Sequence, residues 1–302
     1  MGHSHSHGGH HHHTSNNKTA LKLSFFLITT YMIVEVIGGL LTNSLALLSD
    51  AGHMLSDAAA LGLSYLAMTF GEKEASFSKT FGYKRFEILA AFINGLTLLL
   101  ISLYIFWEAY RRILTPPEVM STGMLTVAVI GLLVNIVAAF ILMRGDKDKN
   151  LNVRSAFLHV LGDLLGSVGA ITAALFIMFF GWNLADPIAS VLVAILIIIS
   201  GYRVTKESIH VLMEGAPAHI DVDNVKKSLL SLKGIKDVHD LHVWSITSDF
   251  LSISCHMVVE QGIDHSEMLS IANKTLHDEY HLEHTTIQIE DDERTCKAIH
   301  CN

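Results

Sequence analysis

Over its first two thirds the chain alternates between long apolar stretches and short polar breaks. Each stretch is close to the about 20 apolar residues that a helix needs to cross a bilayer. The stretches cover residues 21–41, 44–70, 86–110, 119–143, 153–180 and 186–206. The breaks between them are rich in Gly, Pro, Asn and charged residues, and after about residue 215 the chain has an ordinary soluble composition. This pattern predicts six membrane-spanning helices followed by a soluble domain.

The soluble part shows the periodicities of a small α+β domain. Helical periodicity marks residues 221–232 and 266–280, whereas alternation and β-branched residues mark strands at 238–247, 250–260 and 285–290. The order α-β-β-α-β suits a two-layer domain whose expected first strand is weak or absent. The predicted division of the chain is an N-terminal tail, a six-helix membrane domain, a soluble domain and a C-terminal tail, at residues 1–18, 19–214, 215–291 and 292–302.

Composition agrees with a membrane protein. Hydrophobic residues make up 50% of the 302 residues and charged residues 17%, and the mean hydropathy is +0.41. Soluble domains carry about 25% charged residues. The net charge of −8 argues against nucleic acid as a partner. Three cysteines near the C-terminus are too few and too clustered for a secreted disulfide scaffold.

The distribution of basic residues predicts the orientation. If the N-terminus is cytoplasmic, only Arg111 and Arg112 lie outside. The basic residues that then lie inside are Lys18, Lys22, Lys73, Lys79, Lys84, Arg85, Arg144, Lys147, Lys149, Arg154, Arg203 and Lys206. This is a strong positive-inside bias. With an even number of spans, we expect both termini in the cytoplasm.

Two copies of a His-x-x-x-Asp pattern lie inside predicted spans, as His53 with Asp57 and His159 with Asp163. Spacing of four residues places both side chains of a pair on one face of a helix. Ionisable groups in a membrane helix cost about 2.5–3.5 kcal/mol each on insertion scales, so four of them indicate a function. Two imidazoles and two carboxylates suit a tetrahedral zinc-like ion. The pairs predict one metal site between the second and fifth spans, and the alternative is hydrogen bonding between helices.

The charges of these groups suggest a coupling mechanism. Two aspartates and a divalent cation sum to zero, so the loaded site is neutral and tolerable in a low dielectric. Two close carboxylates without metal repel each other, so the empty site should bind protons that metal binding expels. The hypothesis is a metal/proton antiporter. Further polar groups are candidates for the pathway or for supporting the ligands, namely Asp50, Glu35, Asn43 and Asn135.

These segments resemble the cation diffusion facilitator family, in its bacterial zinc, cadmium and cobalt branch. The similarity extends over about residues 15–290, and the motifs that carry it lie at residues 42–57, 81–87, 159–163, 185–190 and 241–245. The resemblance implies a six-helix transmembrane bundle, a cytoplasmic ferredoxin-like domain, a homodimer and export of divalent cations in exchange for protons. His53 favours zinc, and cadmium and cobalt are further candidates because N/O ligand sets do not exclude them.

The resemblance also implies a second metal site, in the soluble domain. His239, His256 and Glu290 fall where relatives place zinc ligands at the dimer interface, and His242 is a further candidate. Strand alternation opposes this, because it places His256 on the polar face of its strand and His239 in register with apolar neighbours. A bulge or a contact across the dimer would be needed to bring them together. The alternative is that each histidine is a solvated surface residue.

Three weaker features complete the prediction. Arg85 and Glu214 resemble the positions of a charge interlock between the membrane and soluble parts in relatives. The first thirteen residues hold seven histidines, including His10, His11, His12 and His13, which form a loose metal-binding tract or a purification tag. Cys296 and Cys301 flank His300 and predict a thiolate metal site or an inert tail.

Rival functions lack their sequence motifs. The chain has no His-Glu-x-x-His, no Ser/His/Asp set and no phosphate-binding Gly-x-x-x-x-Gly-Lys-[Ser/Thr] loop. A passive metal channel or a membrane-anchored metal sensor is the alternative function. We predict a homodimeric secondary transporter of the cell membrane, not an enzyme, with Zn²⁺ as substrate and regulatory ligand and protons as counter-ion.

Overall fold

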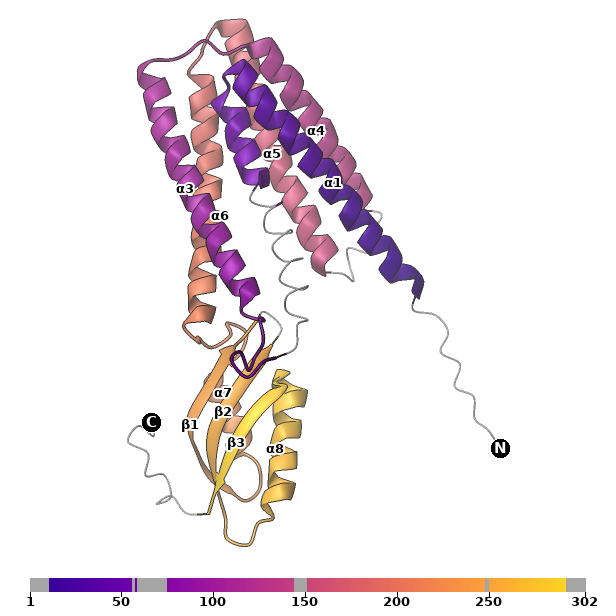
Figure 1. Cartoon of the computed structure of the whole chain (residues 1–302), viewed down its shortest axis with the longest axis vertical. Helices are drawn as coiled ribbons and strands as arrows, with labels where there is room; N and C mark the ends of the chain where they lie inside the picture. Colours follow the sequence, from indigo (N-terminus) through magenta and orange to yellow (C-terminus); the bar gives the residue numbers. More distant parts are fainter. Residues whose placement is uncertain (1–10, 56–57, 59–74, 144–150, 248–249, 292–302) are drawn as a thin grey trace, which may run out of the picture. The chain divides into compact units, whose positions relative to one another are not determined.

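The computed structural model describes residues 11–55, 58, 75–143, 151–247 and 250–291 (Figure 1). The described chain forms two compact units. The first is built from residues up to 62 together with 94–203, and the second from residues 63–93 together with 204–302.

Long helices make up the first unit, and two of them continue into the second. Five of them contain segments long and apolar enough to cross a membrane. They are α1 (His11–Thr42), α3 (Phe86–Leu114), α4 (Ser121–Met143), α5 (Leu151–Phe180) and α6 (Ala185–Leu212). Residues 45–55 form a further helical segment. The five helices confirm five of the six predicted spans. Of the other predicted span, 44–70, the structure describes residues 44–55 and 58, and the remaining residues lie outside the described part of the chain.

The helical segment 45–55 packs between two pairs of helices. On one side Leu45 joins an apolar cluster with Leu98 of α3 and Ile197 of α6. On the other side Ala46 and Leu47 join a cluster of small residues from α4 and α5. Small side chains allow close approach of helices in a membrane protein. The segment that carries His53 therefore packs against α3 and α6 on one side and against α4 and α5 on the other.

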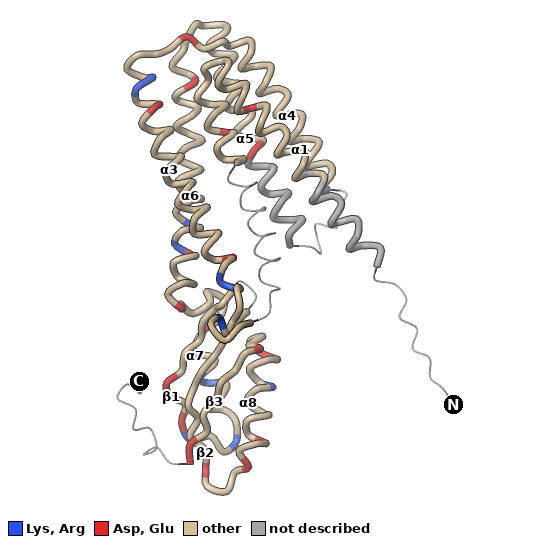
Figure 2. The backbone as a smooth tube through the Cα atoms, viewed as in Figure 1, with Lys and Arg blue, Asp and Glu red and all other residues tan. Residues whose placement is uncertain are grey.

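The outward surfaces of these helices are apolar. Phe179, Leu100 and Phe140 are 72%, 67% and 60% exposed. Figure 2 shows that charged residues are sparse along most of the length of the helices and frequent in the C-terminal domain. Long helices that expose large apolar side chains and few charges are suited to a lipid environment.

The second unit contains a three-stranded sheet in the order β1-β2-β3. Its elements are α7 (Val222–Leu230), β1 (Ile235–Ser245), β2 (Leu251–Val259), α8 (His265–Tyr280) and β3 (His284–Glu290). Strands β1 and β2 are antiparallel, and β3 is parallel to β2 after the crossover through α8. The predicted order α-β-β-α-β is confirmed, and residues 204–221 contain no strand. Ser248 and Asp249, between the first two predicted strands, lie outside the described residues.

One face of this sheet carries the core. Ile253, Cys255 and Met257 alternate along β2 and pack with Leu229 of α7 and Leu276 of α8. Both helices begin at an aspartate whose carboxylate accepts backbone N–H groups of the first turn, Asp221 for α7 and Asp264 for α8. The other face of the sheet is therefore left for the polar residues of β1, β2 and β3.

Candidate metal centres

The helical segment 45–55 and α5 approach each other closely at one point. A Cβ atom on Gly166 of α5 would collide with the carboxylate of Asp50. Asp50 is buried, and so is Asp163, which lies one turn before Gly166 and is 1% exposed. Ala46 and Leu47 pack near Ala173 and Ile177, so residue numbers rise along one helix as they fall along the other. The two helices are antiparallel here, with Asp50 opposite Gly166.

This antiparallel register brings two residues of the predicted metal site, His53 and Asp163, to the same height along the pair of helices. One turn on from Asp50 the segment reaches His53, and one turn back from Gly166 α5 reaches Asp163. His53 is partly buried and Asp163 is buried. Asp57 and the side chain of His159 lie outside the described residues. The structure therefore describes the side chain of one residue from each predicted His-x-x-x-Asp pair, His53 from the first and Asp163 from the second.

Further polar side chains gather around this level from α1 and α4. Glu35 is buried, lies near the Asp50 carboxylate and accepts a hydrogen bond from the Tyr31 hydroxyl at 3.1 Å. Buried Asn135 donates to Ser167, one turn beyond Asp163, at 3.4 Å. The structure thus brings Glu35, Asp50 and Asn135 to the helices of the predicted site. Sequence reasoning missed Tyr31, although its spacing of four residues from Glu35 was a signal.

Asn43 lies elsewhere. It adopts φ +57° just after the end of α1, and its side-chain oxygen accepts from Arg112 at 3.1 Å. Its side-chain nitrogen donates to the Glu118 carbonyl at 3.4 Å. The described contacts of Asn43 are therefore with the last turn of α3 and with the loop before α4, and not with the helical turn of His53.

The close approach at Gly166 gives a testable prediction. In the Gly166→Ala variant the new methyl group must displace the Asp50 carboxylate or separate the two helices. Misplacement of a reacting group by ~1 Å costs about 100-fold in rate, so we expect metal transport to fall about 10- to 100-fold. Gly169→Ala is the matched control, because a Cβ there meets nothing within 4 Å. Initial rates of zinc uptake into vesicles measure both, and equal rates for the two variants would contradict the prediction.

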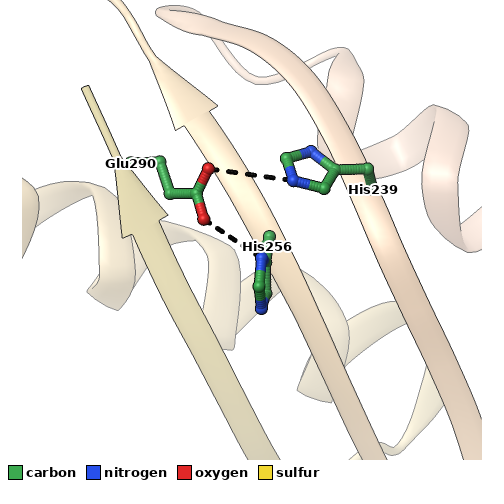
Figure 3. Close-up of side chains that lie close together, drawn as sticks. All are labelled: His239, His256 and Glu290. Carbon is green, nitrogen blue, oxygen red and sulfur yellow. Dashed lines mark ion pairs between the residues drawn. The ribbon is translucent and has the colours of Figure 1, made fainter. Parts of the chain in front are cut away.

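In the soluble domain, His239, His256 and Glu290 converge on the sheet face opposite the core (Figure 3). One ligand atom of each residue lies within 4.8 Å of those of the other two. Glu290 Oε1 is 3.0 Å from His256 Nδ1, and Oε2 is 3.7 Å from His239 Nε2. The Glu290 side chain is only 2% exposed. Two imidazoles and a carboxylate are a typical set of three zinc ligands that leaves a fourth position open.

A bulge in β1 explains how these residues meet. His239 pairs directly with His256, but the register shifts between His239 and His242, and Asp240 between them has φ +50°. The bulge reverses the alternation, so Val238 and Val243 both face the core while His239 faces outward beside His256. This resolves the conflict between alternation and the resemblance.

The unsatisfied polar atoms of the group fit a metal ion. His239 Nε2 and Glu290 Oε2 are buried and make no hydrogen bond to any described residue. Buried polar atoms ordinarily have partners, so the two facing atoms fit a group that binds a cation. Two aspartates that sequence reasoning did not single out lie next to the histidines, Asp237 beside His239 at 3.3 Å and Asp240 beside His256 at 3.7 Å. Their positions next to His239 in the sequence were the available signal.

Other predicted ligands lie apart from this group. The His242 side chain is 62% exposed and pairs with Asp240, so the structure does not bring it to Glu290. Cys255 was not a predicted ligand, and burial raises the pKa of its thiol to about 12, which keeps it protonated and unsuited to bind metal. His10, Cys296, Cys301 and the side chains of His11, His12 and His13 lie outside the described residues.

Arg85 and Glu214 form an ion pair within the second unit, with Arg85 Nη2 3.0 Å from Glu214 Oε1. Arg85 immediately precedes α3, and Glu214 lies just after α6 with φ +61°. Both side chains are largely exposed. Exposed pairs contribute about 0–1 kcal/mol, so this one links two helix ends without adding much stability.

The family of the chain follows from comparison with family models. A model described as the cation efflux transmembrane domain matches residues 21–213, and one described as the cytoplasmic domain of cation efflux proteins matches residues 217–292. The chain belongs to the cation efflux family. This confirms the resemblance carried by the sequence motifs, and the predicted architecture of apolar membrane helices followed by a cytoplasmic domain with a small sheet.

Three relatives span nearly the whole of this cation efflux protein. The "Cadmium, cobalt and zinc/H(+)-K(+) antiporter" of Bacillus subtilis is 56% identical over 96% of this chain and 92% of that one. "Zinc transporter ZitB" of Pectobacterium atrosepticum is 45% identical over 100% and 92% of the two chains. "Metal cation efflux system protein CzcD" of Cupriavidus metallidurans is 41% identical over 96% and 90%. These relatives are transporters, which confirms the prediction of a multi-pass membrane transporter and not an enzyme.

Proposed function

We propose that this protein exports zinc, and also cadmium and cobalt, from the cytoplasm in exchange for protons. The transport site consists of His53 and Asp57 with His159 and Asp163. The observation that carries the proposal is the antiparallel register of the two helices, with Asp50 opposite Gly166. This register brings the helical turn of His53 beside that of Asp163, which supports assigning one residue from each His-x-x-x-Asp pair to a common site. Together the two pairs supply two imidazoles and two carboxylates, the four ligands of a tetrahedral site.

Metal and protons compete for this site. Two carboxylates balance the charge of one divalent cation, so the loaded site is neutral in its low-dielectric surroundings. The empty site gains the same balance by binding protons, which metal binding then expels. The names of the Bacillus subtilis and Pectobacterium relatives support zinc as a substrate, and the former also supports cadmium, cobalt and proton exchange.

The cytoplasmic group of His239, His256 and Glu290 binds a regulatory zinc ion. Its histidine nitrogens and carboxylate oxygen supply three ligand positions, and the open position accepts a water or a residue of a second protomer. We propose that the protein acts as a homodimer with both termini in the cytoplasm, and that the ion pair of Arg85 and Glu214 holds the ends of α3 and α6 together during transport. The cytoplasmic family model supports dimer formation.

Vesicles reconstituted with the purified protein test the exchange. With an acidic lumen, we expect external zinc to enter while the lumenal pH rises, and a protonophore that collapses the gradient to stop net uptake. Uptake that ignores the pH gradient would indicate a channel, and absence of uptake would indicate a sensor. A K⁺ gradient at constant pH is the control, because the name of the Bacillus subtilis relative includes K⁺.

A further inference from the structure

A buried aspartate joins the helical segment 45–55 to α6. Asp186, in the first turn of α6, is 1% exposed. Its carboxylate accepts hydrogen bonds from the Ser44 hydroxyl at 2.6 Å and from the backbone N–H groups of Leu45 and Ala46 at 2.8 and 3.1 Å. These donors begin the segment that carries His53. An acceptor from a residue over 140 positions away therefore caps this helix.

The cap is shared between two residues. The Ser44 hydroxyl accepts a hydrogen bond from the backbone N–H of Leu47 at 3.2 Å. This is the usual bond between an N-cap side chain and the third residue of its helix. The first two N–H groups have no acceptor within their own helix, and both donate to Asp186. The negative charge of Asp186 also lies at the positive end of the helix dipole. Asp186 consequently fixes both the height and the rotation of the segment at its first turn.

Arg112 extends this network to α3. Its Nη1 atom lies 3.6 Å from the Asp186 carboxylate and donates to the Asn43 carbonyl at 2.6 Å. Its Nε atom donates to Glu108 at 3.0 Å. Arg112 is only 11% exposed, so its charge offsets that of Asp186 in poorly solvated surroundings. The same few atoms thus hold together the start of the segment 45–55, the start of α6 and the last turns of α3.

We propose that Asp186 is a positioning residue for metal transport, which sets the height and rotation of the segment 45–55 so that His53 stays opposite Asp163. This inference rests on the proposed transport site. His53 lies seven residues beyond Ala46, or about 10 Å along the helix, so Asp186 acts through the helix and does not contact the metal. A displacement at the first turn is carried to His53 because a helix moves as a stiff rod over two turns.

The test compares three variants of the full-length protein in vesicles. Asp186→Asn removes the charge and presents an N–H group to donors, whereas Asp186→Glu keeps the charge but moves the carboxylate by one methylene. Ser190→Ala is the matched control, because Ser190 is also buried near the start of α6 but its described hydrogen bond, to the Asp186 carbonyl, stays within α6. Zinc KM, the ratio of zinc to cadmium transport rates and the thermal unfolding midpoint are measured for each.

We expect both Asp186 variants to raise the zinc KM about tenfold or more and to shift the zinc-to-cadmium ratio, since ligand displacements below ~1 Å have effects of this size. Ser190→Ala should keep a zinc KM and a zinc-to-cadmium ratio within about twofold of the wild-type values. Lower thermal stability with unchanged KM and ratio would show a purely structural cap and overturn the proposal. If Asp186→Asn does not fold, Asp186→Glu decides. Normal transport by His53→Ala would instead overturn the transport site, independently of Asp186.

Discussion

Asp163→Asn should abolish zinc export. Asp163 is 1% exposed on α5, at the level of His53, and its carboxylate is one of two that balance the charge of the metal in the proposed site. The amide leaves one positive charge unbalanced in a low dielectric and removes the proton-binding group that exchange requires. Changes even to residues that only support a metal ligand cost about 10- to 100-fold, so loss of a ligand should reduce the transport rate by at least about 100-fold.

Initial rates of zinc uptake into vesicles with an acidic lumen measure this effect. Ser167→Ala is the control, because Ser167 is also buried on α5, one turn from Asp163, and bonds to Asn135. We expect Ser167→Ala to retain most of the wild-type rate. If Asp163→Asn transports zinc as fast as Ser167→Ala, Asp163 is not a ligand. If both variants lose transport equally, the loss could come from disruption of α5 rather than from loss of a ligand. The Asp57→Asn variant, which changes the other proposed carboxylate and leaves α5 intact, then decides between these two explanations.

The sequence was sufficient to predict the elements of the fold because their patterns are local. Helix length and apolar content predicted the spans that became α1, α3, α4, α5 and α6. Helical periodicity and strand alternation predicted the order of elements in the soluble domain. The His-x-x-x-Asp pairs were conspicuous because ionisable groups are rare in membrane helices.

Long-range features could not be predicted in the same way. The bulge at Asp240 depends on a positive φ at a non-glycine residue, which no local pattern requires, and alternation alone placed His239 and His256 apart. The role of Asp186 depends on hydrogen bonds to residues over 140 positions away. In sequence it is one more acidic residue in the first turn of a helix, where acidic residues are common.

Glu290→Gln should remove metal binding by the cytoplasmic group while leaving the transport site in place. Glu290 is the only acidic member of the group formed with His239 and His256, and its side chain is 2% exposed. Glutamine keeps the size of the side chain but lacks the charge that draws a cation to two imidazoles. We expect zinc affinity at this site to fall at least about 100-fold, since even partners that only orient a ligand are worth about 10- to 100-fold.

Zinc titration calorimetry of the full-length protein measures the number and affinity of the sites. Asp291→Asn is the matched control, because Asp291 is the next residue, is exposed and pairs with His265 instead. Glu290→Gln should bind one zinc ion fewer per protomer than Asp291→Asn, yet still transport zinc at saturating concentration. Under the regulatory role proposed for this zinc ion, we expect transport at low zinc concentration to be slower in Glu290→Gln. Equal stoichiometry in the two variants would show that His239, His256 and Glu290 hold no metal.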